Sequence, residues 1–264
     1  MFLEKEEIDL NKKFVDQGYI VKPVNNLKEL DKIQKLFIKE ITKKYKSEKN
    51  NLLTLNKFHT KIKLNDLNDF RLNMINCINS YSDFRKKYFS LARQQLYTIV
   101  GNELVMQNKV NLSIQLPNDD SSLLPIHSDT WSGDSPFEVV VWLPLVDCES
   151  TKSMYILPPK HMNEIKKFFN KNKNASSDQI FNKIKKKVEW IKIKYGEFLL
   201  FNQNLPHGNV VNKTKETRWS MNCRFKSLFS PYGDKKIGEF FEPITLRSAS
   251  EIGMNYKYPD ETST

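Results

Sequence analysis

The sequence has little cysteine. Cys77, Cys148 and Cys223 are the only three in 264 residues. Their number is odd, and their spacing matches neither a cysteine-ligated zinc site nor a disulfide framework. Free thiols are typical of proteins in reducing compartments. The cysteine content therefore predicts a cytoplasmic protein without disulfide bonds.

A long apolar run is also missing. No stretch reaches the roughly 20 apolar residues that a membrane-spanning helix needs. The first residues, Met1 to Glu7, include acidic side chains where a signal peptide would have its apolar core. We therefore expect neither a membrane span nor a secretory leader.

Arginine is scarce as well, although the formal net charge is +11. The positive residues are mostly lysines spread along the chain, which is typical of a solvated surface rather than a nucleic-acid-binding site. One run, residues 182–188, concentrates lysine. It leaves open an anionic small-molecule partner such as a sugar phosphate or nucleotide-linked sugar.

The order of the periodic segments predicts the architecture. With 39% hydrophobic residues, the chain can bury the core of one domain, residues 1–264. Residues 1–102 are mainly helical in pattern, and residues 103–228 have strand periodicity with a helical insertion at 161–188. Residues 229–264 form a C-terminal extension with a loose end. Helices that precede strands favour a helical layer packed on an antiparallel β-sandwich.

Within the helical part, the apolar spacing predicts three helices. The first is capped by Asn26 and continues through Tyr45, the second begins near Asp69, and the third begins near Ser82. Residues 46–56 are polar and are expected to form a loop, and a short strand is expected at 19–21.

The candidate metal ligands lie among the strands. On an extended segment, His127 and Asp129 point to the same face, and a buried strand at 137–144 follows them. His207 ends a second apolar strand. Two histidines and one carboxylate form the facial triad of non-haem Fe(II) sites. His161 is expected in a turn, and His59 is expected to be structural.

Two strands carry candidate binding residues. Arg218, Ser220, Asn222 and Arg224 share one face of the strand 217–225, and an arginine fork beside a hydroxyl suits a carboxylate such as that of 2-oxoglutarate. Asn111, Ser113 and Gln115 form a polar face on another strand. We expect this face to line a cavity, although solvent exposure is the simpler alternative.

In this order, His127-x-Asp129, His207 and Arg218 resemble the Fe(II)/2-oxoglutarate-dependent dioxygenases of the phytanoyl-CoA dioxygenase type. Residues 14–21 are similar to the opening strand of that family, and residues 141–145 to its central strand. Residues 218–231 and 239–244 resemble the bacterial branch found in surface-carbohydrate gene clusters.

The resemblance implies a double-stranded β-helix, or jelly roll, flanked by N-terminal helices. It implies Fe(II) on His127, Asp129 and His207, with 2-oxoglutarate and O2 as co-substrates. Arg218, Ser220 and Gln115 would bind 2-oxoglutarate. Because Asp129 is present, whereas halogenating relatives lack this carboxylate, hydroxylation of a small polar substrate is expected.

Several alternatives stay open. Asn111, Trp131 and Arg224 are candidate substrate contacts, but Trp131 could equally be core, and Arg224 could compete for 2-oxoglutarate. Phe240 and Phe241 could pack on the barrel or form a homodimer contact. The function could also be that of a cupin-like metal-dependent isomerase or dioxygenase without 2-oxoglutarate, or of a non-catalytic sugar-binding jelly roll.

Overall fold

Helices cover one side of the molecule and also form a projecting hairpin. The computed structural model describes residues 2–259. Its α-helices are α1 (Lys5–Gln17), α2 (Leu27–Thr42), α3 (Asn51–Asn56), α4 (Leu64–Ser80), α5 (Phe84–Ser90), α6 (Arg93–Ile99), α7 (Met162–Lys171), α8 (Ser177–Ile184) and α9 (Ser248–Asn255).

The strands form two antiparallel sheets. They are β1 (Tyr19–Pro23), β2 (Leu104–Gln107), β3 (Asn111–Gln115), β4 (Val139–Pro144), β5 (Tyr155–Ile156), β6 (Glu189–Trp190), β7 (Glu197–Asn202), β8 (His207–Gly208), β9 (Arg218–Ser227) and β10 (Phe241–Thr245). The large sheet has the order β1-β7-β4-β9-β2-β10, with β3 also paired to β9, and the small sheet has the order β6-β5-β8.

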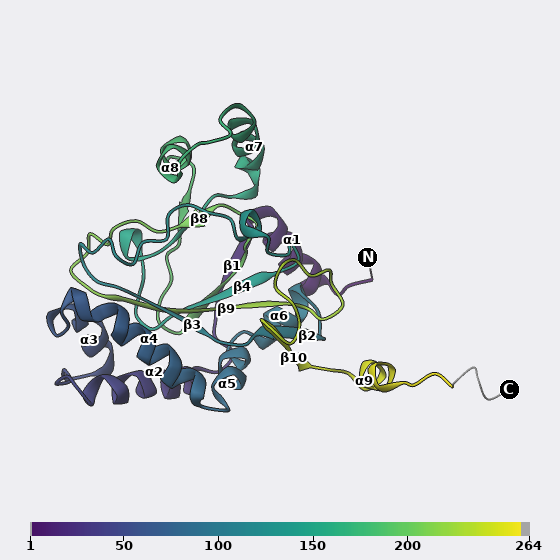
Figure 1. The fold of residues 1–264 in the computed structure, drawn as a ribbon, viewed down its shortest axis with the longest axis horizontal. Helices are drawn as coiled ribbons and strands as arrows, with labels where there is room; N and C mark the ends of the chain where they lie inside the picture. Colours follow the sequence, from purple (N-terminus) through teal and green to yellow (C-terminus); the bar gives the residue numbers. More distant parts are fainter. Residues whose placement is uncertain (1, 260–264) are drawn as a thin grey trace.

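Strand β9 shows how the sequence builds the two layers. Its odd-numbered residues, including Trp219, Met221 and Cys223, are buried in the main core. Trp219 packs edge-on against Phe37 of α2 and donates from Nε1 to the carbonyl of Leu55 at 3.0 Å. The even-numbered residues point to the other face, as the period of a strand requires. Helices α2 to α5 therefore lie beneath the large sheet, and the polar face of β9 is left for the site (Figure 1).

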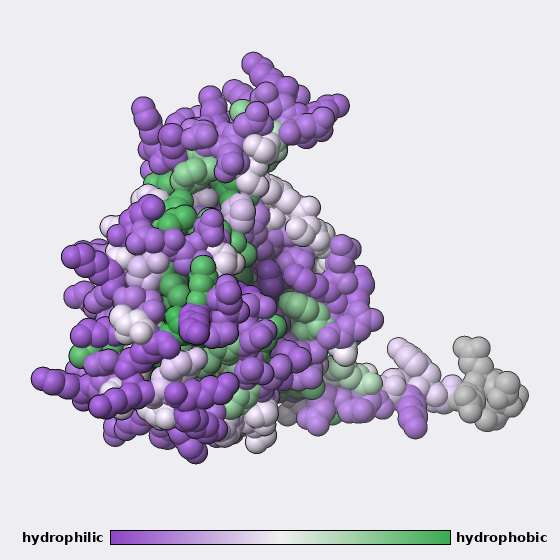
Figure 2. Space-filling model, turned by 60° about the vertical axis from the view of Figure 1, so that its left-hand side comes forward, coloured by the Kyte–Doolittle hydropathy of each residue, from purple (hydrophilic) through white to green (hydrophobic). Residues whose placement is uncertain are grey.

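Helices α7 and α8 project from the opposite side (Figure 1). Ile165, Ile180 and Ile184 on their inner faces form a small second core with Ile126 and Tyr155. Figure 2 shows that the outer surface of this hairpin is hydrophilic, whereas apolar side chains are exposed on the body below it. The insertion thus sits beside Ile126, the neighbour of His127.

Several expectations about the elements need correction. Residues 14–17 belong to α1 rather than to an opening strand, because Gly18, at φ 78°, ends the helix and the strand begins at Tyr19. The expected loop at 46–56 contains α3, which is capped by Asn50. The helix expected near Ser82 is divided into α5 and α6. Helices thus contribute more than expected, and the fold is mixed α/β.

The C-terminal extension packs on the sheet. Phe241 is fully buried with Val105 and Leu228, and Phe240 packs edge-on against it at 4.9 Å between ring centroids. Phe240 and Phe241 could have packed on the barrel or formed a homodimer contact, and the structure supports packing within the chain. Helix α9 overlaps the segment expected to be loose, and residues 260–264 lie outside the described residues. Within residues 2–259, no helix combines the length and apolarity needed to cross a membrane.

Candidate metal centre

A backbone pairing between the loop that precedes β4 and strand β8 of the small sheet positions the histidines. His127 and His207 exchange both backbone hydrogen bonds, at 3.0 and 2.8 Å, and their rings lie 4.3 Å apart between centroids. Each Nδ1 is 2.8 Å from the carbonyl oxygen two residues earlier, of Pro125 and Leu205 respectively. When Nδ1 donates to that carbonyl, Nε2 keeps its lone pair free for a metal.

Asp129 completes the group. Its backbone N–H donates to the carbonyl of Gln203 at 3.2 Å, and its Oδ1 lies 3.4 Å from Nε2 of His127. One ligand atom each from His127, Asp129 and His207 lies within 4.8 Å of the others. The structure therefore brings together the three residues that the sequence singled out as metal ligands.

The protonation states of His207 and Asp129 suit a divalent cation. Burial and the neighbouring charge of His127 lower the pKa of His207 to about 4, which keeps this imidazole neutral. Burial alone would raise the pKa of Asp129, but the hydrogen bond to His127 and the charge of Arg224 hold it below its usual value. A neutral imidazole and an ionised carboxylate are the forms that bind metal.

The three residues open onto a cavity of about 260 Å³ between the two sheets. Its walls differ in chemistry. The apolar wall includes Val140, Trp142, Met154 and Phe201, and the polar wall comprises Asn111, Ser113, Asn222 and both arginines of β9, Arg218 and Arg224. The face expected to line a cavity does so at Asn111 and Ser113.

Arg218 is buried without a counter-ion. Its side chain is 3% exposed, and its Nη2 donates to Oγ of Ser113 at 2.9 Å. Its Nε and the hydroxyl of Ser220 have no hydrogen-bond partner among the described residues, and no carboxylate of residues 2–259 forms an ion pair with it. Burial lowers its pKa to about 10, so it still carries a proton at neutral pH. Since unpaired buried charges are costly, this arrangement fits an anionic ligand.

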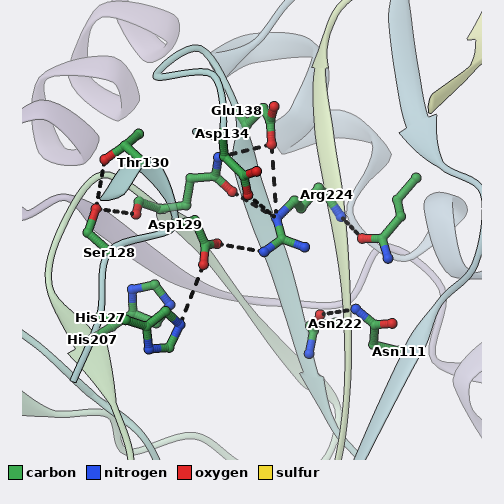
Figure 3. Close-up of polar contacts among 12 residues, drawn as sticks. Asn111, His127, Ser128, Asp129, Thr130, Asp134, Glu138, His207, Asn222 and Arg224 are labelled. Atoms are coloured by element: carbon green, nitrogen blue, oxygen red, sulfur yellow. Dashed lines mark hydrogen bonds and ion pairs between the residues drawn. The ribbon is translucent and has the colours of Figure 1, made fainter. Parts of the chain in front are cut away.

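Arg224 has the opposite surroundings (Figure 3). Its Nη2 lies 2.9 Å from Oδ2 of Asp129, and its Nε lies 3.5 Å from Asp134 and 4.0 Å from Glu138. Nε also donates to Oε1 of Gln203 at 3.0 Å. The two arginines on one strand face are therefore not equivalent.

The other predicted residues lie as follows. Asn111 donates to Oδ1 of Asn222 at 3.1 Å beside the cavity. Gln115 is buried and donates to the carbonyl of Val210 at 2.7 Å, but it is not among the lining residues. Trp131 is 45% exposed and packs edge-on against Phe169 of α7, outside the cavity. His161 lies in a turn, as expected.

Sequence reasoning missed Asp134, Glu138 and Gln203, which surround Arg224. Only Glu138 left a signal, because an acidic residue at the start of an apolar strand is unusual. Asp134 and Gln203 come from loops whose proximity only the tertiary fold provides.

The sequence matches no protein-family model and no curated protein. Solved structures share the fold. A nickel complex of the non-haem monooxygenase ThoJ has a TM-score of 0.56 and 14% identity, covering 92% of this chain and 86% of that chain. HygX from Streptomyces hygroscopicus with nickel and 2-oxoglutarate bound has a TM-score of 0.52 and 14% identity, covering 87% and 89%.

The non-haem alpha-ketoglutarate-dependent epimerase SnoN from nogalamycin biosynthesis has a TM-score of 0.50 and 14% identity, covering 88% of this chain and 87% of that chain. At such identities the likeness concerns the fold. The chain therefore has the fold of these non-haem enzymes, and it carries a His-Asp-His group in its central cavity.

Proposed function

We propose that the protein is an Fe(II)- and 2-oxoglutarate-dependent oxygenase of the phytanoyl-CoA dioxygenase type, built on a double-stranded β-helix. One observation carries the proposal: a buried arginine without a carboxylate partner shares a cavity with a His-Asp-His group. HygX, which has this fold, binds nickel and 2-oxoglutarate, and SnoN is an alpha-ketoglutarate-dependent enzyme.

His127, Asp129 and His207 would hold Fe(II) and leave positions on one side for 2-oxoglutarate and O2. When bound, iron and 2-oxoglutarate supply the oxidising chemistry that inserts oxygen into a C–H bond. The far carboxylate of 2-oxoglutarate would accept hydrogen bonds from Arg218 and Ser220, which satisfies the unpaired Nε and hydroxyl. Ser113 of β3 orients the guanidinium, and Gln115 of the same strand, which pairs with Arg218, would support this wall.

The apolar wall has a separate role. Val140, Trp142 and Phe201 exclude water from the reaction and leave a surface for the substrate carbon to be oxidised. The proposed outcome is hydroxylation, because Asp129 occupies the position where a halogenating enzyme would need space for halide.

For the substrate, we propose a small polar molecule of surface-carbohydrate biosynthesis, with an anionic group outside the cavity. Arg224 is already paired with carboxylates, whereas lysines such as Lys167, Lys171 and Lys183 cluster on the hairpin α7/α8. Binding of nucleotide-linked sugars should weaken as salt rises. Binding that is insensitive to salt would remove the anionic part of this proposal.

Anaerobic titration with Fe(II) and then 2-oxoglutarate tests the function. The chelate gives a weak visible charge-transfer band, which we expect in the wild type and in the surface control Arg93→Met, but not in Arg218→Met. Bound iron without a band in the wild type would refute the use of 2-oxoglutarate. It would favour a cupin-like metal enzyme instead, whereas absence of metal binding would favour a sugar-binding jelly roll.

A further inference from the structure

The two carboxylate oxygens of Asp129 have different partners. Oδ1 faces the imidazoles and lies 3.4 Å from Nε2 of His127, whereas Oδ2 lies 2.9 Å from Nη2 of Arg224 (Figure 3). A carboxylate can bind a metal through one oxygen or through both. An ion pair at Oδ2 competes with the second mode, since a guanidinium hydrogen bond and a metal bond would use the same oxygen.

Arg224 is itself held in place from several sides. Gln203 accepts from its Nε at 3.0 Å, and Asp134 and Glu138 lie within 4.0 Å of the same nitrogen. The ring of Phe240 covers the guanidinium at 5.9 Å from its centroid. Movement of the guanidinium away from Asp129 would therefore also remove a positive charge from beside Asp134 and Glu138.

The supporting groups are anchored in turn. Glu138 accepts from Nε2 of Gln203 at 2.9 Å and from the backbone N–H of Ser135 at 3.2 Å. Lys235 forms an ion pair with Asp134 at 2.5 Å. Residues of the metal-binding loop (residues 116–138, between β3 and β4), of the turn after β7 and of the C-terminal extension therefore converge on one guanidinium.

We propose that Arg224 is a positioning residue that reserves Oδ2 of Asp129, so that a bound metal receives a single oxygen from this carboxylate. A second Asp129 oxygen on the metal would occupy one of the three positions that the facial triad leaves open. Because 2-oxoglutarate takes two of them, Arg224 would preserve the position at which O2 binds. This inference rests on the metal centre of the proposed function, and its cosubstrate part rests on 2-oxoglutarate binding.

Nitric oxide, which binds Fe(II) in place of O2, gives a direct readout. Under anaerobic conditions, the wild-type protein with Fe(II) and 2-oxoglutarate should bind nitric oxide and give the electron paramagnetic resonance signal of an iron–nitrosyl. Arg224→Met should retain Fe(II), because it removes a positive charge near the cation. Its nitrosyl signal in the presence of 2-oxoglutarate should fall by about tenfold or more, as for loss of an outer-shell partner.

Arg218→Met is the matched control, because it removes the other buried arginine of the same strand face. It should lose 2-oxoglutarate binding but still form the nitrosyl with Fe(II) alone. A full signal in Arg224→Met at wild-type 2-oxoglutarate occupancy would overturn the proposal. Failure of the wild type to bind Fe(II) or 2-oxoglutarate would refute the proposed function instead.

A second measurement does not depend on the folding of a variant. A crystal structure of the wild-type protein with Mn(II) should show one oxygen of Asp129 on the metal and the other on Arg224. Two Asp129 oxygens on the metal, or an Arg224 side chain turned away from Asp129, would equally contradict the assigned role.

Discussion

At the scale of single residues, the polar side chains on one face of β9 differ in whether they have hydrogen-bond or ion-pair partners. Arg224 is surrounded by carboxylates, whereas Arg218 and Ser220 are buried with polar atoms that have no partner in the described chain. A buried hydroxyl without a hydrogen bond destabilises the folded state by about 1–3 kcal/mol. Such groups are retained when a ligand satisfies them.

Ser220→Ala should therefore have opposite effects on stability and on binding. Without ligand, the melting temperature should stay the same or rise, because an unsatisfied hydroxyl is removed. With Mn(II) bound, the affinity for 2-oxoglutarate should fall by about 10- to 150-fold, which corresponds to a lost hydrogen bond to a charged group. Calorimetric titration measures the affinity, and thermal unfolding measures the stability. Unchanged affinity would show that Ser220 does not contact 2-oxoglutarate.

At the scale of elements, the metal-binding loop and the C-terminal extension lie backbone against backbone. The N–H of Asp234 donates to the carbonyl of Gly133 at 3.0 Å, and Oγ of Ser135 donates to the carbonyl of Pro231 at 2.6 Å. A Cβ at Gly233 would collide with the carbonyl of Gly133 and approach the N–H of Ser135 at 2.8 Å. The loop that carries Asp129 thus depends on the segment after β9.

Gly233→Ala should separate these two segments. We expect a loss of about 1–3 kcal/mol in the free energy of unfolding, as for overpacking at a tight contact, together with weaker metal binding. Gly253→Ala in α9 is the matched control, since a Cβ there meets nothing within 4 Å. Chemical denaturation and Mn(II) titration measure both effects. If both variants bound Mn(II) equally well, the C-terminal extension would not support the site.

Sequence patterns predicted the elements best where one face is buried. Helix α2 has the expected apolar face, and Asn26 caps it by accepting from the N–H of Glu29 at 3.2 Å. Helix α1 was not predicted, because residues 14–21 were assigned together to an opening strand, whereas Gly18 ends the helix and the strand begins at Tyr19. Helix α3 was not predicted because it lies in a stretch that was interpreted as a polar loop. Its N-cap, Asn50, is nevertheless the same residue type as the N-cap of α2, Asn26.

The site residues that lie on extended segments were predictable, because side chains alternate between the two faces of a strand. His127, Asp129, His207 and Arg218 could be grouped from order and spacing, and the structure places them around one cavity. The partners of Arg224 could not be grouped in this way, because Asp134, Glu138 and Gln203 lie on segments that pairing brings together only in the folded chain. The placement of Trp131 on Phe169 likewise depends on where the insertion packs.

At the scale of the whole molecule, the metal centre connects the large sheet with the small sheet. His127 precedes β4 of the large sheet, and His207 lies on β8 of the small sheet. A metal bound only by the folded state stabilises the fold by about 2.7 kcal/mol at 100 times its dissociation constant. Metal loading is therefore expected to stabilise the entire domain.

Mn(II) at 100 times its dissociation constant should raise the melting temperature by about 5–10 °C. This shift follows because, at this chain length, each kcal/mol of added stability raises the melting temperature by about 2–4 °C. A chelator should reverse the shift, and Asp129→Ala should abolish it. Differential scanning calorimetry is the measurement. A melting temperature that Mn(II) leaves unchanged would argue against a metal centre.

In the proposed function, one cavity binds metal and 2-oxoglutarate together, with Arg218 at the far end. Anaerobic calorimetric titration of 2-oxoglutarate into metal-free and Mn(II)-loaded protein tests it most directly. We expect tight binding only to the Mn(II)-loaded wild type, and a loss of that binding in Arg218→Met while Mn(II) stays bound. Equal 2-oxoglutarate binding with and without Mn(II), or full binding in Arg218→Met, would show that this cavity does not bind the two ligands together through Arg218.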